Sequence, residues 1–577
     1  MFGIVLSPEC SHLKAEDYIY FASIKQCGAQ VYDVVTKKTG TVVYVILERF
    51  ATIGQESKKP NKIMSLIKSL SIVTGFTMIS RILGLLREMV TASKFAATEA
   101  TDALFVAFRI PNLLRRLFAE GAFAQAFVPI ITEYREKEGE ERAKLLISHV
   151  ASLLSVALLI VSISGVVGAP YLIYLVASGF STSGDQLQLT TDLLRITFPY
   201  ILFVSLTSLS TSVLNVWGKF AVPAVTPALL NLSFILFALF LTNHFDPPII
   251  ALAVGIFVGG LAQLMFQIPF LWRLGLSVKP RWNPRDPGIL QILRRMGPAI
   301  FGVSAAQISL VINTNIASYF RVGSVSWLNY ADRLMELPIG LLAVAMTTVV
   351  LPSLSRAVST DNAEEYTSVL TWGTRLLLLV SIPSIVGLII LAEPIIVTLL
   401  MRGEFSEYDV AMTEVAFWGY GFGLIALIMI KLFASIFYAN KDTKTPVKIA
   451  LVALIFTQAL NFVFWFLFPY EYRHRGLALA ISGGAWLNLG LLTWMLVRKK
   501  LFVPYQRLLI SVGRSVIGVL VMGSLLGLAS KQVDWYLLPE WQRGSYLGFL
   551  VVAGALIYVV TLKSVGQSFA DLLRAKR

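Results

Sequence analysis

Long apolar stretches, separated by short loops rich in lysine and arginine, recur along the chain from Met64 onward. A helix that spans a bilayer needs about 20 mainly apolar residues. Stretches of that kind lie at 66–92, 103–132, 146–178, 190–217, 222–243, 248–274, 296–320, 326–354, 369–400, 410–439, 446–468, 475–497, 508–530 and 544–564. The pattern predicts an all-α polytopic membrane protein with about 14 transmembrane helices.

The composition fits a membrane protein better than a nucleic-acid binder. Of the 577 residues, 56% are hydrophobic and only 14% are charged, whereas a soluble globular chain is far more polar. The net charge is +15, but the basic residues lie in many loops and do not form one arm or face. We therefore expect no nucleic-acid partner.

The distribution of basic residues between loops predicts the orientation. If the segment at Met64 begins in the cytoplasm, the cytoplasmic loops contain most of the lysines and arginines, as at Arg135, Arg295 and Lys444, and the opposite loops contain few. Positive charge is retained on the cytoplasmic side of such proteins. Both ends of the chain are therefore predicted to be cytoplasmic.

The chain divides by sequence into an N-terminal extension, two lobes and a C-terminal addition. Residues 1–63 lack the pattern of a signal peptide, and MSLIKSLSIVTGFTMISRILG from Met64 resembles the natural start of a membrane protein. The extension is thus either a mis-assigned start or a small cytosolic appendage. We expect six-helix lobes at 64–275 and 276–500, and two further helices with a short cytoplasmic tail at 501–577.

Short similarities between the lobes suggest parallel repeats around a central cavity. ASKF at Ala92 to Phe95 and AFVPI at Ala126 to Ile130 recur as ASYF at Ala317 to Phe320 and VVLPS at Val349 to Ser353. A repeat with an even number of helices keeps its orientation in the membrane. Chance similarity among apolar helices is the alternative, because the matches are short.

Several functional classes have no supporting motif. The histidines are scattered and form no HExxH spacing, so we expect no catalytic or structural metal. The two cysteines, Cys10 and Cys27, both lie in the extension, and no disulfide framework is implied. No GxxxxGK[ST] loop is present, so transport would draw on an ion gradient, the membrane potential or a partner.

Charged residues inside the predicted spans are the candidate functional residues. Each such charge costs on the order of 3 kcal/mol on insertion scales and so normally faces a cavity or a partner. They concentrate in the first, second and eighth spans, where Asn112 accompanies them; the set is Arg81, Arg87, Asp102, Arg109, Arg115, Arg116, Glu120, Asp332, Arg333 and Glu336. Arginine pairs with phosphate through two parallel hydrogen bonds, so a cavity lined by several arginines favours a multivalent anion. Snorkelling to the interface, or local pairing of Arg333 with Asp332 or Glu336, is the alternative for single residues.

Longer strings carry a resemblance to a known family. They are SRILGLLRE (Ser80 to Glu88), ATDALFVAFRIPNLLRRLFAEGAFAQAFVPI (Ala100 to Ile130), RITFPYI (Arg195 to Ile201), MGPAIFGVSAAQISLVINT (Met296 to Thr314), SVSWLNYADRLMELPIG (Ser324 to Gly340) and KTPVKIA (Lys444 to Ala450). From Met64 to about Val565 the chain resembles the MurJ (MviN) family of lipid II flippases, within the multidrug/oligosaccharidyl-lipid/polysaccharide exporter superfamily.

The resemblance implies a function, a cargo and a set of site residues. It implies alternating access that moves lipid II, a polyprenyl-diphosphate-linked disaccharide pentapeptide, to the outer leaflet of the bacterial inner membrane for cell-wall synthesis. The two C-terminal helices would form a groove for the lipid tail. The family's functional residues correspond to Arg81, Arg87, Arg115, Arg333, Asn112, Asp102, Glu120 and Asp332. Membrane lipids and other cell-wall synthesis proteins would be further partners.

Some points stay open at this stage. Glu88 stands where some relatives have aspartate, which preserves the charge. Some relatives bind sodium in the second lobe, but those ligands cannot be matched here, so coupling to sodium or to the membrane potential stays open. An exporter of another polyprenyl-linked oligosaccharide or of drugs is the alternative function. A glycosyltransferase or polymerase is a third, but the predicted outer loops are too short to hold its catalytic acid.

Overall fold

The structure is a computed structural model of the whole chain. It describes the backbone at 19–26, 29–36, 42–45, 62–116, 122–276, 281–502 and 506–567. Side chains are described from Gly75 onward within these ranges, except at 122, 298–306, 337, 341, 343–349, 506–507 and 509. The chain forms two compact units, Met1–Gly75 and Phe76–Arg577, and the second contains nearly all of the helices.

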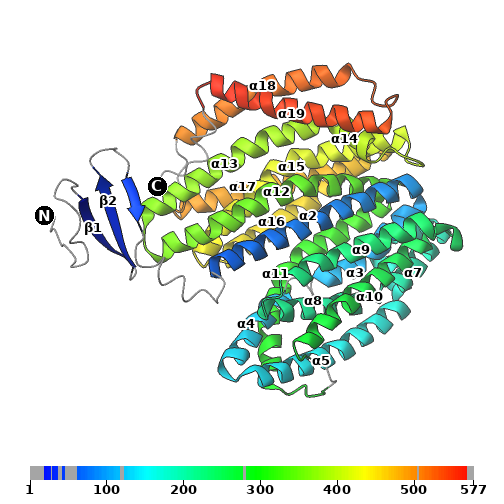
Figure 1. Ribbon diagram of the computed structural model, residues 1–577. Coiled ribbons are helices and arrows are strands. Elements are labelled where there is room, and N and C mark those ends of the chain that lie inside the picture. The colour runs from blue at the N-terminus through cyan, green and yellow to red at the C-terminus, as the bar shows by residue number, and fades with distance from the viewer. Residues whose placement is uncertain are drawn as a thin grey trace. The chain divides into compact units, whose positions relative to one another are not determined.

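The helices of the first half begin with α2 and end with α10 (Figure 1). Their bounds are α2 Lys62–Phe95, α3 Glu99–Arg115, α4 Ala122–Lys137, α5 Glu140–Val167, α6 Ala169–Val176, η3 Ser178–Thr182, α7 Gly184–Thr197, α8 Tyr200–Val216, α9 Ala221–Phe240, η4 Thr242–His244 and α10 Ile250–Arg273. We call α2–α10 the first lobe. Its broken helices are interrupted at Gly168 and at Pro199, residues with low helix propensity.

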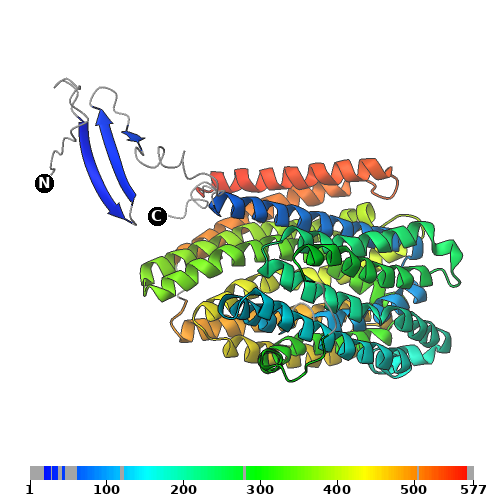
Figure 2. The ribbon, with the colours of Figure 1, turned by 60° about the horizontal axis from the view of Figure 1, so that its bottom comes forward.

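The helices of the second half run from α11 to α19. Their bounds are α11 Pro287–Ser318, α12 Ser324–Ser359, α13 Ala363–Ile390, α14 Ala392–Leu399, α15 Glu407–Ala439, α16 Lys444–Leu467, η5 Tyr470–Tyr472, α17 Arg473–Arg498, α18 Gln506–Lys531 and α19 Glu540–Ser564. We call α11–α17 the second lobe. In both ribbon views α18 and α19 run side by side, and they pack against α13 and α14 (Figures 1 and 2).

The polytopic, helical character of the sequence prediction is confirmed. Each predicted segment overlaps one helix or one broken helix. Ten helices of the described part are long and apolar enough to cross a membrane. That search covered only the described residues, which leave gaps within α11 and α12 and between α3 and α4. The prediction of about 14 spans is thus roughly consistent with the structure.

The second predicted span is described only in part. We expected one helix over 103–132, and the structure describes α3 to Arg115 and α4 from Ala122. The N–H of Arg116 donates to the carbonyls of Asn112 and Leu113. Residues 117–121 of this predicted span lie outside the described residues.

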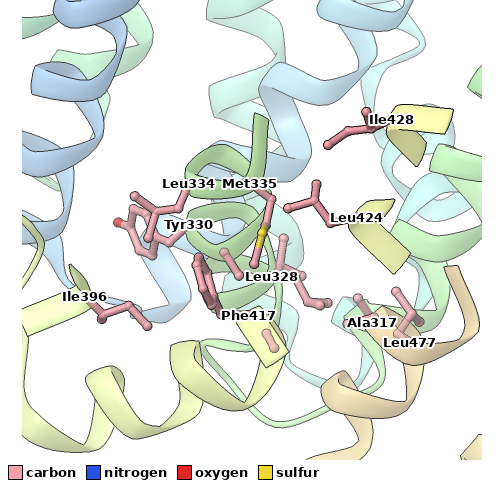
Figure 3. Packing of buried hydrophobic residues seen from close by; sticks show 14 of the residues in the cluster. Ala317, Leu328, Tyr330, Leu334, Met335, Ile396, Phe417, Leu424, Ile428 and Leu477 are labelled. Carbon is pink, nitrogen blue, oxygen red and sulfur yellow. The ribbon is translucent and has the colours of Figure 1, made fainter. Parts of the chain in front are cut away.

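The second lobe is organised around α15, which packs against α12, α13 and α17. Its buried side chains Phe417, Leu424 and Ile428 belong to the same hydrophobic cluster as Leu334 and Met335 of α12 (Figure 3). Close approach to α17 uses small residues: a Cβ at Gly423 would lie only 2.5 Å from Ser482 Oγ. Small residues at such contacts are characteristic of helix packing within membranes, where van der Waals contact replaces the hydrophobic effect.

The start of α11 connects the lobes. Ile289 and Ile292 of α11 are buried in a cluster formed mainly by α4, α5 and α8 of the first lobe. Asp286, the N-cap residue of α11, is buried as well. Its carboxylate accepts a hydrogen bond from Gly288 N at 2.9 Å and forms an ion pair with Arg142 at 3.1 Å. His149 Nδ1 lies 2.9 Å from the same carboxylate. One buried carboxylate therefore joins the start of α11 to α5.

A small sheet precedes the helices and was not predicted. Strands β1 Ile19–Gln26, β2 Ala29–Thr36 and β3 Val42–Val45 pair antiparallel in the order β1-β2-β3. The register pairs Ile19 with Thr36 and Tyr32 with Val45. These strands are rich in β-branched and aromatic residues, which favour strands. The all-helical prediction therefore holds for the unit from Phe76 and not for this segment.

Candidate functional site

A large cavity of about 750 Å³ lies between the lobes. Its walls come from α2, α3, α8, α9 and α10 of the first lobe and from α12 and α15 of the second. Six cations line it, namely Arg81, Arg87, Arg115, Arg116, Arg333 and Lys431, against only two carboxylates, Glu88 and Glu336. Field lines concentrate in a cleft of one charge sign, so this cavity attracts anions.

One carboxylate in the wall of this cavity lies between arginines of the two lobes. Glu88 Oε1 lies 2.5 Å from Arg87 Nη2 on α2 and 3.8 Å from Arg333 Nε on α12. The Glu88 side chain is only 5% exposed, and its second oxygen has no hydrogen-bond partner among the described residues. Arg333 also donates to Glu336 Oε2 at 2.8 Å. The arginines are thus held by carboxylates that an incoming anion can displace.

Asn231 of α9 positions Arg87. Its Oδ1 accepts a hydrogen bond from Arg87 Nη1 at 3.2 Å, and its Nδ2 donates to the Ser80 carbonyl at 3.1 Å. The guanidinium also lies 5.4 Å from the ring centre of Phe234 on the same helix, a cation–π arrangement. Arg87 is therefore fixed within the first lobe and not by the opposite lobe alone.

Arg81 lies against the second lobe. A Cβ built at Gly340 of α12 would lie 2.0 Å from Arg81 Nη1. A side chain larger than that of glycine at this position would push the guanidinium out of its present place against α12. On α3, Arg115 Nε donates to Asn112 Oδ1 at 2.9 Å, as the i+3 spacing predicts, and both line the cavity.

A small cavity of about 90 Å³ adjoins the large one, with which it shares seven lining residues. Asp332, a predicted site residue, lines this small cavity and not the large one. Arg109 lines it too and donates to Thr314 Oγ1 of α11 across the lobe boundary. Beside Asn112, which both cavities share, two further amide residues line it, Gln307 of α11 and Asn329 of α12.

Asp102 lies elsewhere than the sequence suggested. It is buried, and it lines neither cavity. Its carboxylate accepts hydrogen bonds from Gly323 N and Ser326 N, both at 2.8 Å, and from the Ser326 hydroxyl. Asp102 of the first lobe thus caps the N-terminus of α12 in the second, where the helix dipole favours a negative charge. Glu120 lies outside the described residues.

The capped end of α12 belongs to a set of contacts that joins the lobes at one end of the bundle. Tyr330 Oη donates to the Ala96 carbonyl at 3.1 Å. Glu404 N donates to the Ser93 carbonyl at 2.9 Å. Gly179 N donates to Ser318 Oγ at 3.0 Å, and Asn315 and Tyr319 add hydrogen bonds to Ser178. We call this end, with Asp102, the closed end.

Sequence reasoning did not name Glu88, Lys431 or Asn231 as site residues, although all three line the large cavity. Glu88 was given only as a residue that stands where some relatives have aspartate. Lys431 and Asn231 stand alone within long apolar stretches, and that isolation within a span was the available signal. The described residues contain no cluster of three or more His, Cys, Asp or Glu that would hold a metal ion.

The fold and the site together define the class of protein to which this chain belongs. Two helical lobes around a cationic cavity, with two further helices beside the second lobe, constitute a multi-pass membrane transporter fold for anionic cargo. The family described as lipid II flippase MurJ matches residues 91–550. The chain is 44% identical over 476 residues, 82% of its length, to 92% of the lipid II flippase MurJ of Burkholderia cenocepacia. It is 38% identical over 519 residues, 88% of its length, to 98% of the probable lipid II flippase MurJ of Vibrio cholerae.

Solved structures agree. A lipid II flippase MurJ in an inward closed conformation matches 87% of this chain and 99% of its own, with a TM-score of 0.71 and 28% identity. A MATE-family multidrug resistance transporter of the MOP superfamily, in an inward-facing conformation, matches 74% of this chain and 98% of its own, with a TM-score of 0.63 and 13% identity, which shows a shared fold alone. The chain belongs to the MurJ family, whose members are transporters and not enzymes.

Proposed function

We propose that this protein flips lipid II from the inner to the outer leaflet of the bacterial cytoplasmic membrane for cell-wall synthesis. The observation that carries the proposal is the large cavity of about 750 Å³, in which six cations face two carboxylates. Lipid II joins a diphosphate to a bulky sugar-peptide head group. A cavity of this size and charge suits a large anion, and membership in the MurJ family supports this particular cargo.

In the proposed mechanism the diphosphate replaces Glu88 as the partner of Arg87 and Arg333. The oxygens of the cargo then bind Arg87 of the first lobe and Arg333 of the second at the same time. Arg81 and Arg115 line the same cavity. Charge-assisted bidentate pairs between arginine and phosphate are among the strongest hydrogen bonds in proteins. Only the head group crosses, while the polyprenyl tail stays in lipid beside α18 and α19.

Alternating access requires the closed end to open and the opposite end to close. By the loop charges, the closed end faces away from the cytoplasm and both termini lie inside. The membrane potential, at about 2.3 kcal/mol per charge per 100 mV, would draw an empty cationic cavity back toward the cytoplasm. A sodium gradient is the alternative driving force. Enzymes that make or consume lipid II are the further partners implied.

The test compares cavity arginines with an exposed one in a lipid II accessibility assay. Arg81→Ala and Arg333→Ala, expressed at normal level, are expected to lower flipping about 10- to 150-fold, because each removes a charged hydrogen-bonding partner worth about 1.5–3 kcal/mol. Lysine at these positions should rescue only in part, since it lacks the planar fork. Arg273→Ala, on the exposed last turn of α10, is the control. Full flipping by both cavity variants would overturn the proposal.

The alternative cargo is another polyprenyl-linked oligosaccharide, which shares the diphosphate. Reconstituted protein offered both lipids would separate the two, because binding to the arginines alone predicts no preference. Export of cationic drugs is disfavoured by the excess of cations in the cavity.

A further inference from the structure

The small cavity has an amide lining that the proposed binding of a diphosphate does not use. Gln307 and Asn329 are 7% and 8% exposed, and they come from opposite sides of the turn between α11 and α12. Gln307 Oε1 and Asn329 Nδ2 have no hydrogen-bond partner among the described residues. A buried polar atom without a partner costs about 1–3 kcal/mol, so such atoms in a cavity wall call for an explanation.

The unpartnered atoms differ in kind. Asn329 Nδ2 is a donor and Gln307 Oε1 is an acceptor. The remaining wall includes the apolar side chains of Phe105, Phe108 and Leu104. A group that fits all three features needs a hydrogen-bond acceptor, a donor and an apolar part. A secondary amide with its attached carbon has them: the C=O accepts, the N–H donates, and the carbon contacts the aromatic rings.

The size of the small cavity limits what enters it. A single water needs roughly 10–15 Å³ of such space, whereas this cavity offers about 90 Å³. Four heavy atoms, as in an acetamido group, fit that volume. The cavity adjoins the large one along Arg87, Glu88 and Arg333, so a substituent of a head group whose diphosphate lies on these arginines reaches it without leaving the site.

We propose that Gln307 and Asn329 form a subsite for a secondary amide of the cargo head group, and that this subsite sets selectivity beyond charge. The inference rests on the proposed function. Two parts of such a head group contain this chemistry: the acetamido substituents of the amino sugars and the amide bonds of the peptide. Binding there turns the two side-chain amides onto the ligand and supplies the partners that they otherwise lack.

The test measures transport of three lipids by reconstituted full-length protein. The first is intact lipid II. The second has hydroxyls in place of the acetamido groups and keeps the peptide, and the third keeps the acetamido groups and lacks the peptide. Two lost neutral hydrogen bonds at about 0.5–1.5 kcal/mol each predict that wild type transports one of the altered lipids roughly 5- to 150-fold less efficiently. The altered lipid that is transported less efficiently identifies the source of the amide.

Variants of Gln307 and Asn329 then test whether the preference for the intact lipid arises at this subsite. Asn329→Leu and Gln307→Met keep the side-chain volume and remove the hydrogen-bonding groups, so the preference is expected to fall to within about twofold. Gln458→Met, which removes an amide that bonds to Ser309 and Asn313 away from both cavities, is the control and should keep it. Arg333→Ala should lower transport of all three lipids alike.

The outcomes separate the two proposals. If wild type does not move intact lipid II, the proposed function fails. If wild type moves all three lipids equally, or if both amide variants keep the full preference, the subsite is overturned while the flippase function stands. The ratio between lipids is the decisive quantity, because a merely structural role of Gln307 or Asn329 would lower every rate and leave the ratio unchanged.

Discussion

Gly179→Ala should weaken the closed end, and the structure gives the size of the effect. An added Cβ would lie 2.4 Å from the carbonyl carbon and oxygen of Ser318, in the opposite lobe. Ordinary contact begins at 3.4 Å, so the two backbones must separate by about 1 Å. Neither is the flexible end of a side chain. Overpacking of this kind costs about 1–3 kcal/mol. It therefore shifts the equilibrium between the conformations with this end closed and open about 5- to 150-fold toward the open one.

Distance measurements between spin labels test this shift. Labels at Tyr171 of the first lobe and Val322 of the second, 82% and 41% exposed, report on the separation of the lobes at this end. Cys10 and Cys27 are replaced by serine so that only the introduced cysteines react. Gly179→Ala is expected to enrich the longer distances, both in detergent and in lipid.

A matched control lies five residues further along. Gly184 begins α7, has no atom within 4 Å of its added Cβ and does not have a positive φ. Gly184→Ala should leave the distances unchanged. Gly403→Ala is an independent second case, since its Cβ would lie 2.2 Å from the Ser93 carbonyl oxygen. If Gly179→Ala and Gly403→Ala both give the distance distribution of the Gly184→Ala control, the closed end does not depend on these backbone approaches.

Three further outcomes are expected. Gly340→Ala should displace Arg81 and lower lipid II flipping as Arg81→Ala does, without an additive effect in the double variant; independent losses in the flipping assay would contradict this. Asn231→Ala should weaken cargo binding by freeing Arg87, with partial rescue by glutamine, and an unchanged affinity would refute the positioning role. Burial raises the pKa of Asp286, but its hydrogen bonds and ion pair outweigh this and hold that pKa below the usual 3.8. Its contribution to stability is therefore present above about pH 4 and lost at lower pH, so Asp286→Asn should reduce the acid dependence of thermal unfolding.

The sequence predicted the spans well because about 20 apolar residues in a row have few other structures available. It predicted the arginine cavity for a related reason: charges within spans are costly and gather where water or a partner reaches them. Arg81, Arg87, Arg115 and Arg333 line one cavity from three helices, α2, α3 and α12.

The place of Asp102 shows where such reasoning stops. Asp102 and Arg109 are seven residues apart and share a face of α3, so spacing groups them together. Along the helix, however, they are separated by roughly 10 Å, which carries Asp102 out of the cavity region and onto the N-terminus of α12. Helical periodicity gives the face on which a residue lies. Its partner at the end of a helix depends on a segment more than 200 residues away.

The separation of Asp102 from Glu88 also gives the acidic residues distinct roles. Glu88 balances the arginines of the cavity, whereas Asp102 holds the closed end. Helices α2 and α12 contain both the contact of Glu88 with Arg333 and contacts of the closed end, whose Asp102 comes from α3. On α2, Arg87 and Glu88 precede the carbonyls of Ser93 and Ala96 by about two turns, and on α12 the capped start precedes Arg333 by about three.

A diphosphate that displaces Glu88 from Arg333 therefore changes the tie between α2 and α12 within roughly 15 Å of the closed end, along rigid helices. Each hydrogen bond of the closed end contributes about 0.5–1.5 kcal/mol, and each one that the Asp102 carboxylate accepts contributes about 1.5–3 kcal/mol. Differential binding of the cargo to the two states shifts their populations when it exceeds the free-energy difference between those states. Cargo recognition and opening are thus linked through two continuous helices, and no separate relay of side chains is required.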